Sequence, residues 1–253
     1  MNLTELFDTA TTIVADGKGI LAADESTPTI KKRFDSIHVE SNEANRQAYR
    51  NMLFTTAGVG DFISGVILFD ETIRQQATDN RSMVEVIKDA GMVPGIKVDK
   101  GAKPLANRPN ETVTEGLDGL RDRCREYFDL GARFAKWRAV IRIGEGIPSQ
   151  NCIATNAHAL ARYAILCQET GLVPIVEPEV LMDGDHSIER CYEVTEFTLK
   201  RLYADLFDQG VILEGTGLKP NMIVPGKKCA DQASREEVAE MTVQCLLNSV
   251  PAA

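Results

Sequence analysis

The chain is 253 residues long, 43% hydrophobic and 26% charged, with a formal net charge of −9. This composition is typical of a soluble globular protein of one large domain or two small ones, and the acidic balance disfavours nucleic acid as a partner because it repels the phosphate backbone. The N-terminal segment carries Glu5 and Asp8 where a signal peptide needs basic residues, and no apolar run is long enough to span a bilayer, so we expect a cytoplasmic protein that makes no membrane contact.

Short apolar or β-branched runs alternate along the chain with amphipathic segments. The runs predict strands at 19–25, 65–69, 93–99, 133–144, 173–180 and 210–219. The amphipathic segments predict helices at 43–57, 83–90, 114–130, 157–168, 187–209 and 234–249. Gly91 and Gly171 each follow a predicted helix, at the position where a left-handed glycine ends one. No linker or low-complexity tract divides the sequence, which favours a single domain over 1–253.

Cysteine and histidine usage predicts neither disulfides nor a metal site. The six cysteines are far apart and form no C-x-x-C pair, which indicates reduced thiols. The three histidines match no zinc spacing. Asp183, Asp185 and His186 could in principle hold an ion, but "DGDH" is more typical of a turn before a helix. We therefore expect no metal and no cofactor.

Alternating strands and helices predict a parallel sheet, as either an open doubly wound fold or a closed (β/α)8 barrel. An open dinucleotide-binding fold needs a glycine-rich turn after its first strand. The nearest candidate, "GEGIPS" at 144–149, follows the fourth strand and lacks the third glycine. The barrel is therefore favoured, with about six of its eight βα units in this chain.

Charged residues near the ends of otherwise apolar strands are the most informative feature of the sequence. Residues two apart share a face of a strand, which pairs Lys97 with Asp99, Lys136 with Arg138, and Glu177 with Glu179. Each charge alone is more often a solvated residue or part of a structural ion pair. Their repetition over several strands favours a convergent polar pocket at the catalytic face of a barrel.

Lys219 is the candidate nucleophile of that pocket. It precedes Pro220, which has no amide donor and marks the end of a strand. A lysine buried beside other cations has a lowered pKa, so its amine can attack a carbonyl and form an imine. Carbon–carbon cleavage next to an iminium also needs a base and an acid, and Asp24 and Glu177 are available for these tasks.

The sequence strongly resembles the class I fructose-bisphosphate aldolases from about Leu6 to its last residue. The resemblance lies in the segments "GILAADES", "SGVILFDET", "GIKVDKG", "GLDGLRDRC", "FAKWR", "VPIVEPE", "DGDH" and "LEGTGLKPNM". It implies a glycolytic, metal-independent, cytoplasmic lyase that cleaves fructose 1,6-bisphosphate through a Schiff base, and a homotetrameric assembly.

The family's functional residues can be carried over position by position. Lys219 is similar to the Schiff-base lysine, Asp24 to the residue that handles the C4 hydroxyl proton, and Glu177 to the residue that dehydrates the carbinolamine. Glu179 and Lys136 resemble the neighbouring carboxylate and the second lysine of that site. The resemblance assigns the sugar bisphosphate to the residues Lys97, Arg138, Ser26, Lys32 and Arg33.

The sequence also departs from the family. Pro28 stands where the family usually has glycine, which predicts a stiffer loop, and Gly217 replaces a larger residue, which predicts a close backbone approach or a bulge. The chain ends before the last two βα units of the family, either as a fragment or as a short protein that pairs with another copy. We favour the fragment. We expect these 253 residues to cleave fructose 1,6-bisphosphate weakly or not at all, because one of the two phosphate-binding sites of the family is missing.

Two other functions are compatible with parts of this pattern. A transaldolase-like Schiff-base enzyme would use the same lysine chemistry, but the linked segments "FAKWR" and "VPIVEPE" argue against it. A non-catalytic truncated aldolase that acts as an interaction or scaffold module is the alternative from a different class. Imine formation at Lys219 distinguishes the enzyme from the scaffold.

Overall fold

The computed structural model describes residues 2–252 and divides them into two compact units. The first unit contains the chain up to Val98 together with Arg121–Lys136 and Cys167–Val173. The second unit contains Asp99–Leu120, Trp137–Leu166 and the chain from Pro174 onward.

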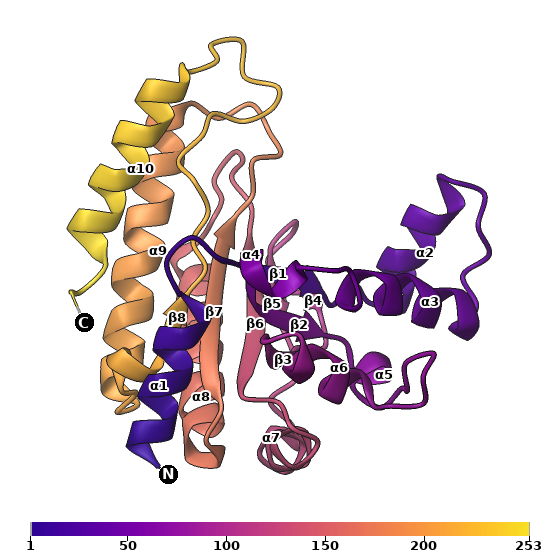
Figure 1. Ribbon diagram of the computed structural model, residues 1–253. Coiled ribbons are helices and arrows are strands. Elements are labelled where there is room, and N and C mark those ends of the chain that lie inside the picture. Colours follow the sequence, from indigo (N-terminus) through magenta and orange to yellow (C-terminus); the bar gives the residue numbers. More distant parts are fainter. Residues whose placement is uncertain (1, 253) are drawn as a thin grey trace. The chain divides into compact units, whose positions relative to one another are not determined.

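Helices and strands alternate along the chain, as the sequence pattern predicts (Figure 1). The elements up to β3 are α1 Leu3–Ile13, β1 Gly19–Ala23, α2 Thr27–Asp35, α3 Glu43–Phe54, α4 Val59–Phe62, β2 Ile63–Leu68, α5 Asp70–Ile73, α6 Met83–Asp89 and β3 Val93–Lys97. The remaining elements are β4 Ala102–Pro104, β5 Thr112–Thr114, α7 Leu120–Asp129, β6 Phe134–Ile141, α8 Gln150–Thr170, β7 Val173–Val180, α9 Ile188–Asp208, the 3₁₀ turn η1 Leu213–Gly215, β8 Gly217–Leu218 and α10 Arg235–Ser249.

The strands β1, β2, β3, β6, β7 and β8 are hydrogen-bonded in that order, and the pairs β1–β2, β2–β3, β3–β6 and β7–β8 are parallel. Five of the six predicted strands are confirmed to within a few residues. Their side chains are largely buried, as expected of a parallel sheet with both faces covered.

The sixth prediction, a strand over 210–219, is wrong for most of its length. Only Gly217–Leu218 pairs with β7, because the preceding residues close a tight turn. The amides of Gly215 and Thr216 donate to the carbonyls of Ile212 and Leu213, at 3.2 and 3.0 Å, and are therefore not available to a strand ladder. The close approach expected at Gly217 is confirmed, since a Cβ there would lie 3.2 Å from Ile175 Cγ1.

In the first unit, glycines shape both the helix ends and the sheet. Gly91 adopts a φ of 78° directly after α6, as the sequence predicts, and a capping box between Ser82 and Glu85 begins that helix. Gly95 in β3 lies against the Phe134 ring, where a Cβ would come within 2.3 Å of ring carbons. The phenyl ring therefore takes the space that a side chain on β3 would need.

The loop predicted around Pro28, over 26–29, is wrong for most of its length, because α2 begins at Thr27. Pro28 lies in the first turn of α2, where a missing amide donor costs nothing and the fixed φ suits a helix. The helix packs on α3 through an edge-to-face contact between Phe34 and Tyr49, with ring centroids 5.8 Å apart (Figure 1).

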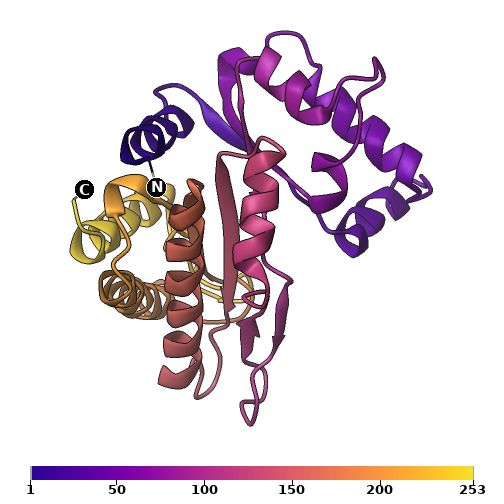
Figure 2. The same cartoon turned by 90° about the horizontal axis from the view of Figure 1, so that it is seen from below.

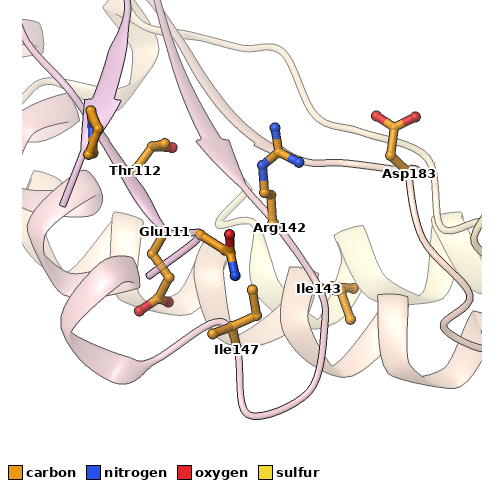
Figure 3. A pocket seen from close by; sticks show the side chains of 8 residues that line it. Glu111, Thr112, Arg142, Ile143, Ile147 and Asp183 are labelled. Carbon is orange, nitrogen blue, oxygen red and sulfur yellow. The ribbon is translucent and has the colours of Figure 1, made fainter. Parts of the chain in front are cut away.

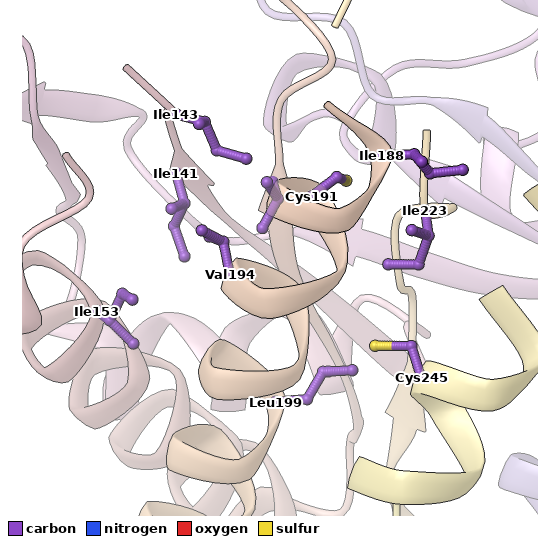
Figure 4. Packing of buried hydrophobic residues seen from close by; sticks show 10 residues of the cluster. Ile141, Ile143, Ile153, Ile188, Cys191, Val194, Leu199, Ile223 and Cys245 are labelled. Carbon is purple, nitrogen blue, oxygen red and sulfur yellow. The ribbon is translucent and has the colours of Figure 1, made fainter. Parts of the chain in front are cut away.

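In the second unit, the helices α9 and α10 lie side by side (Figures 1 and 2). Ser187 and Ser234 cap their N-termini by accepting hydrogen bonds from backbone amides three residues on. A hydrophobic cluster from β6, α8, β7, α9 and α10 fills the interior of this unit (Figure 4), and its members are Ile141, Ile143, Ile153, Val180, Ile188, Cys191, Val194, Leu199, Ile223 and Cys245. Leu218 packs against this cluster, which anchors the residue immediately before Lys219.

The helix predicted over 114–130 begins only at Leu120. The residues before it form the two-stranded antiparallel hairpin β4–β5, which Figure 2 shows as a separate ribbon. Positive φ angles at Gly116 and Gly119 separate β5 from α7, since left-handed residues do not continue a helix. Within residues 2–252, no helix is both long and apolar enough to cross a membrane.

Candidate active site

Asp24 and Lys136 form a buried ion pair in the first unit. Asp24 follows the last residue of β1, and Lys136 is the third residue of β6. Lys136 Nζ lies 2.6 Å from Asp24 Oδ2, and the two side chains are only 8% and 10% exposed. Lys97 occupies the position of β3 that pairs in register with Lys136, so two lysines stand on neighbouring strands.

The segment after Asp24 carries three of the predicted phosphate-binding residues. The side chain of Glu25 is buried and forms an ion pair with Arg33 Nη1 of α2, whose side chain is 60% exposed. Ser26 Oγ lies 3.1 Å from Thr29 Oγ1, and Lys32 is exposed on α2. Ser26 therefore lies in the short connection between β1 and α2 that begins at Asp24, and Arg33 reaches this connection from α2.

Lys219 is paired with Glu177 in the second unit. The register of β7 and β8 sets Leu218 opposite Val176, and the Lys219 amide donates to the Val176 carbonyl at 2.9 Å. The next residue of β7 is Glu177, and its carboxylate forms an ion pair with Lys219 Nζ. Backbone pairing thus places this acid beside this amine.

The surroundings of Lys219 differ from the expectation in one respect. The sequence predicts an amine buried beside other cations, but the Lys219 side chain is 51% exposed and its ion-pair partner is a carboxylate. The reason is the shortness of β8, which ends one residue earlier and leaves the lysine at the start of a loop. Glu177, in contrast, is only 4% exposed.

Arg138 and Glu179 form a second ion pair in the same unit, from neighbouring strands β6 and β7. Asp99 lies two residues past the end of β3, and its carboxylate accepts from the Arg138 amide at 3.3 Å and from the Gly101 amide at 3.1 Å. Asp99 therefore fixes the backbone around Arg138. As the sequence predicts, Lys136 and Arg138 lie on one strand, β6. Glu177 and Glu179 likewise lie together on β7.

A cavity of about 550 Å³ lies beyond the end of β6 in the second unit (Figure 3). Its lining contains none of the predicted site residues and consists of Pro104, Asn110, Glu111, Thr112, Arg142, Ile143, Ile147 and Asp183. Glu111 is 4% exposed, and its carboxylate accepts from Ser149 N at 2.6 Å and Ser149 Oγ at 2.8 Å. These bonds assign Glu111 a structural role just before α8.

The "DGDH" segment forms the expected turn before a helix, and His186 is buried within it. Burial lowers the pKa of His186 below its ordinary value. Among residues 2–252, no three histidine, cysteine or acidic side chains are grouped closely enough to hold a metal ion. The six cysteines, which all lie in this range, are not cross-linked.

Residues 5–253 match the family model named Glycolytic, which is described as fructose-bisphosphate aldolase class-I. The chain belongs to the class I fructose-bisphosphate aldolase family. A relative from Xanthomonas campestris, described as a probable fructose-bisphosphate aldolase class 1, is 63% identical over 252 residues, which cover all of this chain and 75% of the relative. An Arabidopsis thaliana relative, described as cytosolic fructose-bisphosphate aldolase 4, is 56% identical over 98% of this chain and 63% of the relative.

A solved structure of the aldolase from Plasmodium falciparum superimposes with a TM-score of 0.97 at 50% identity. The match covers 98% of this chain and 72% of the solved chain. It confirms the predicted fold class, an α/β barrel of which about six βα units are present, because the six-stranded sheet corresponds to part of that aldolase.

One residue beside the predicted aldolase site, Arg50, is not among the predicted site residues. Arg50 of α3 is completely buried, and its Nη2 donates to the Glu25 carbonyl at 2.7 Å. A usable signal exists, because Arg46, Arg50 and Phe54 recur every four residues and form the buried stripe of α3. Two arginines in an inward-facing stripe indicate buried carboxylates or carbonyls nearby.

Proposed function

We propose that this chain is a fructose-bisphosphate aldolase that cleaves fructose 1,6-bisphosphate reversibly to dihydroxyacetone phosphate and glyceraldehyde 3-phosphate, a step of glycolysis and gluconeogenesis. The single observation that supports this mechanism best is the Lys219–Glu177 pair, which joins an accessible amine just past the end of β8 to a buried carboxylate on the neighbouring parallel strand β7. Membership of the family supports the substrate class.

The pair holds what imine formation requires. Transfer of a proton from the Lys219 ammonium to Glu177 leaves a neutral amine and a carboxylic acid. The amine adds to the C2 ketone of the substrate, and Glu177 returns the proton to the carbinolamine hydroxyl, which leaves as water. The product is an iminium between Lys219 and C2, and Glu179 beside Arg138 supplies a further carboxylate in this part of β7.

Carbon–carbon cleavage is assigned to Asp24 and Lys136. The Asp24 carboxylate takes the proton of the C4 hydroxyl, the C3–C4 bond breaks, and its electron pair moves into the iminium to give an enamine. Glyceraldehyde 3-phosphate departs as the aldehyde. Protonation at C3 and hydrolysis of the imine then release dihydroxyacetone phosphate and the free lysine. Lys136 Nζ, 2.6 Å from Asp24 Oδ2, holds the carboxylate in place for the first of these transfers.

The substrate phosphates are assigned to Lys97, Arg138, Ser26, Lys32 and Arg33. Two of these cations already form ion pairs with glutamates, Arg33 with Glu25 and Arg138 with Glu179. A phosphate therefore competes with a carboxylate at both arginines.

Several further properties belong to the same proposal. Residues 1–253 are proposed to belong to a single barrel domain, and the enzyme is proposed to work without a metal or other cofactor. The proposed location is the cytosol, as in the description of the Arabidopsis relative, and the proposed assembly is a homotetramer.

Cleavage in the presence of a metal chelator tests the proposed function. We expect the chain, incubated in large excess over isotopically labelled fructose 1,6-bisphosphate, to release labelled triose phosphates at the same rate with and without EDTA, because the iminium takes the electrons that a metal would otherwise stabilise. Nuclear magnetic resonance detects both products. Release that stops on EDTA addition, or that equals the release by a Lys219→Arg variant, contradicts the proposal.

A further inference from the structure

Arg50 is a buried cation that points at the backbone of the proposed catalytic segment. Its side chain is 0% exposed, its Nη2 donates to the Glu25 carbonyl at 2.7 Å, and its Nη1 lies 3.5 Å from Glu71 Oε2. The guanidinium also lies over the Phe69 ring, 5.8 Å from its centroid. All of these groups belong to the first unit.

Burial on this scale is unfavourable for the arginine itself. Transfer of a cation out of water costs several kcal/mol after relaxation, and a single ion pair at 3.5 Å offsets only part of it. Burial accordingly lowers the pKa of Arg50, against the opposing effect of the nearby carboxylates Glu25, Glu71 and Asp24. The neighbouring arginine of α3, Arg46, makes a much better pair with Glu71, with contacts of 2.8 and 2.5 Å. Anchoring Glu71 therefore does not require Arg50.

The distinctive contact of Arg50 is its bond to the Glu25 carbonyl. This carbonyl belongs to the peptide that joins Glu25 to Ser26, one residue beyond Asp24 and at the start of α2. The Asp24–Ser26 segment is thereby held from three directions. Lys136 holds the Asp24 carboxylate, Arg33 holds the Glu25 carboxylate, and Arg50 alone, among these contacts, holds the backbone.

We propose that Arg50 is a positioning residue for the aldol cleavage, which holds the backbone of Asp24–Ser26 so that the Asp24 carboxylate reaches the C4 hydroxyl of the bound ketose bisphosphate. This inference rests on the proposed function, because it assigns a role within that reaction. A displacement of about 1 Å from the productive geometry can slow a reaction about 100-fold. Loss of Arg50 thus slows bond cleavage while the imine at Lys219, which depends on Glu177, still forms.

A single-turnover trap separates these two steps. The chain is mixed with fructose 1,6-bisphosphate, and the reaction is quenched with borohydride at a series of times. The mass of the reduced adduct on the Lys219 peptide is then measured by mass spectrometry. A hexose bisphosphate adduct records an imine that has not been cleaved, and a triose phosphate adduct records one that has. For Arg50→Met we expect the rate at which the triose adduct replaces the hexose adduct to fall by roughly 10- to 100-fold, with hexose capture unchanged.

Arg46→Met is the matched control, because it removes a guanidinium from the same helix and from the same Glu71 but leaves the Glu25 carbonyl bond intact. It is expected to convert hexose to triose adduct as the unmodified chain does. Equal slowing in Arg46→Met and Arg50→Met, or unchanged conversion in a folded Arg50→Met, overturns the inference. The inference is also overturned if Arg50→Met slows capture of the hexose at Lys219 by the same factor as conversion to the triose adduct. A general structural defect would slow both steps.

If Arg50→Met does not fold, Arg50→Lys decides. Lysine keeps the charge but replaces the several donors of the planar guanidinium with a single ammonium group. We therefore expect conversion of the hexose adduct to the triose adduct to be partly slowed, while the rate of hexose capture stays normal. Unchanged conversion in this variant contradicts a positioning role for the guanidinium. Failure of the proposed function has a different signature, namely no triose adduct on Lys219 of the unmodified chain, whether or not a hexose adduct forms there.

Discussion

Replacement of Lys136 by methionine is expected to lower the free energy of unfolding by about 3–5 kcal/mol, the usual cost of removing one partner from a buried ion pair. The Asp24 side chain is 10% exposed and loses the cation 2.6 Å away, so the carboxylate remains buried without its ion-pair partner. Methionine matches the lysine stem in volume, which keeps a cavity from adding to the effect. Urea unfolding followed by circular dichroism measures the change.

Two further variants test whether burial of the ion pair causes this loss of stability. Lys31→Met removes a cation from the Lys31–Asp35 pair, which has a similar separation of 2.7 Å but side chains that are 60% and 54% exposed. Its cost is expected to stay below about 1 kcal/mol, because water screens the pair. The double variant Asp24→Leu with Lys136→Met removes both charges and is expected to recover most of the lost stability. Equal effects of Lys136→Met and Lys31→Met contradict burial as the cause.

Replacement of Glu177 by glutamine is expected to slow imine formation at Lys219 by roughly 10²- to 10⁴-fold, the usual contribution of a positioned acid–base group. Glutamine keeps the shape of the side chain but cannot transfer a proton. Rapid mixing with dihydroxyacetone phosphate, followed by borohydride quenching at increasing times, gives the rate of adduct formation. The final extent of labelling is expected to approach that of the unmodified chain, since the nucleophile is still present.

Glu214→Gln provides the control for this change. Glu214 is exposed and lies five residues before Lys219 in η1, so it shares the local chain segment but not the ion pair. Its substitution is expected to leave the labelling rate unchanged. A Glu177→Gln rate within threefold of normal shows that another group supplies the proton.

The strands and helices are largely predictable from the sequence because burial and periodicity coincide along most of the chain. β2 and β7 are buried along almost their whole length, although β7 also carries Glu177 and Glu179. The glycine after α8, Gly171, has a φ of 89° where the sequence places a helix end. The prediction fails where local hydrogen bonds override hydrophobicity. The apolar residues 211–213 enter a 3₁₀ turn rather than a strand, and the polar hairpin β4–β5 forms despite having no hydrophobic alternation.

The sequence predicts which charged residues share a strand, but it does not predict which of them form ion pairs. Side-chain parity identifies Lys136 with Arg138 and Glu177 with Glu179, because position on a strand is a local property. The ion pairs depend on the register between strands, which single-strand patterns do not specify. The spacing of Arg46, Arg50 and Phe54 indicates one buried stripe of α3, but the contact of Arg50 with Glu25 depends on how α3 packs and is found only in the structure.

Covalent capture of dihydroxyacetone phosphate by borohydride, with the labelled peptide identified by mass spectrometry, tests the Schiff-base account most directly. The account predicts one reduced triose phosphate on the peptide that contains Lys219, no comparable label on the peptides of Lys97 or Lys136, and loss of the label in Lys219→Arg. Arginine keeps the positive charge but is not a nucleophile at neutral pH, so substrate binding alone leaves no adduct. An unlabelled Lys219 peptide, or a label on another lysine that persists in Lys219→Arg, contradicts the account.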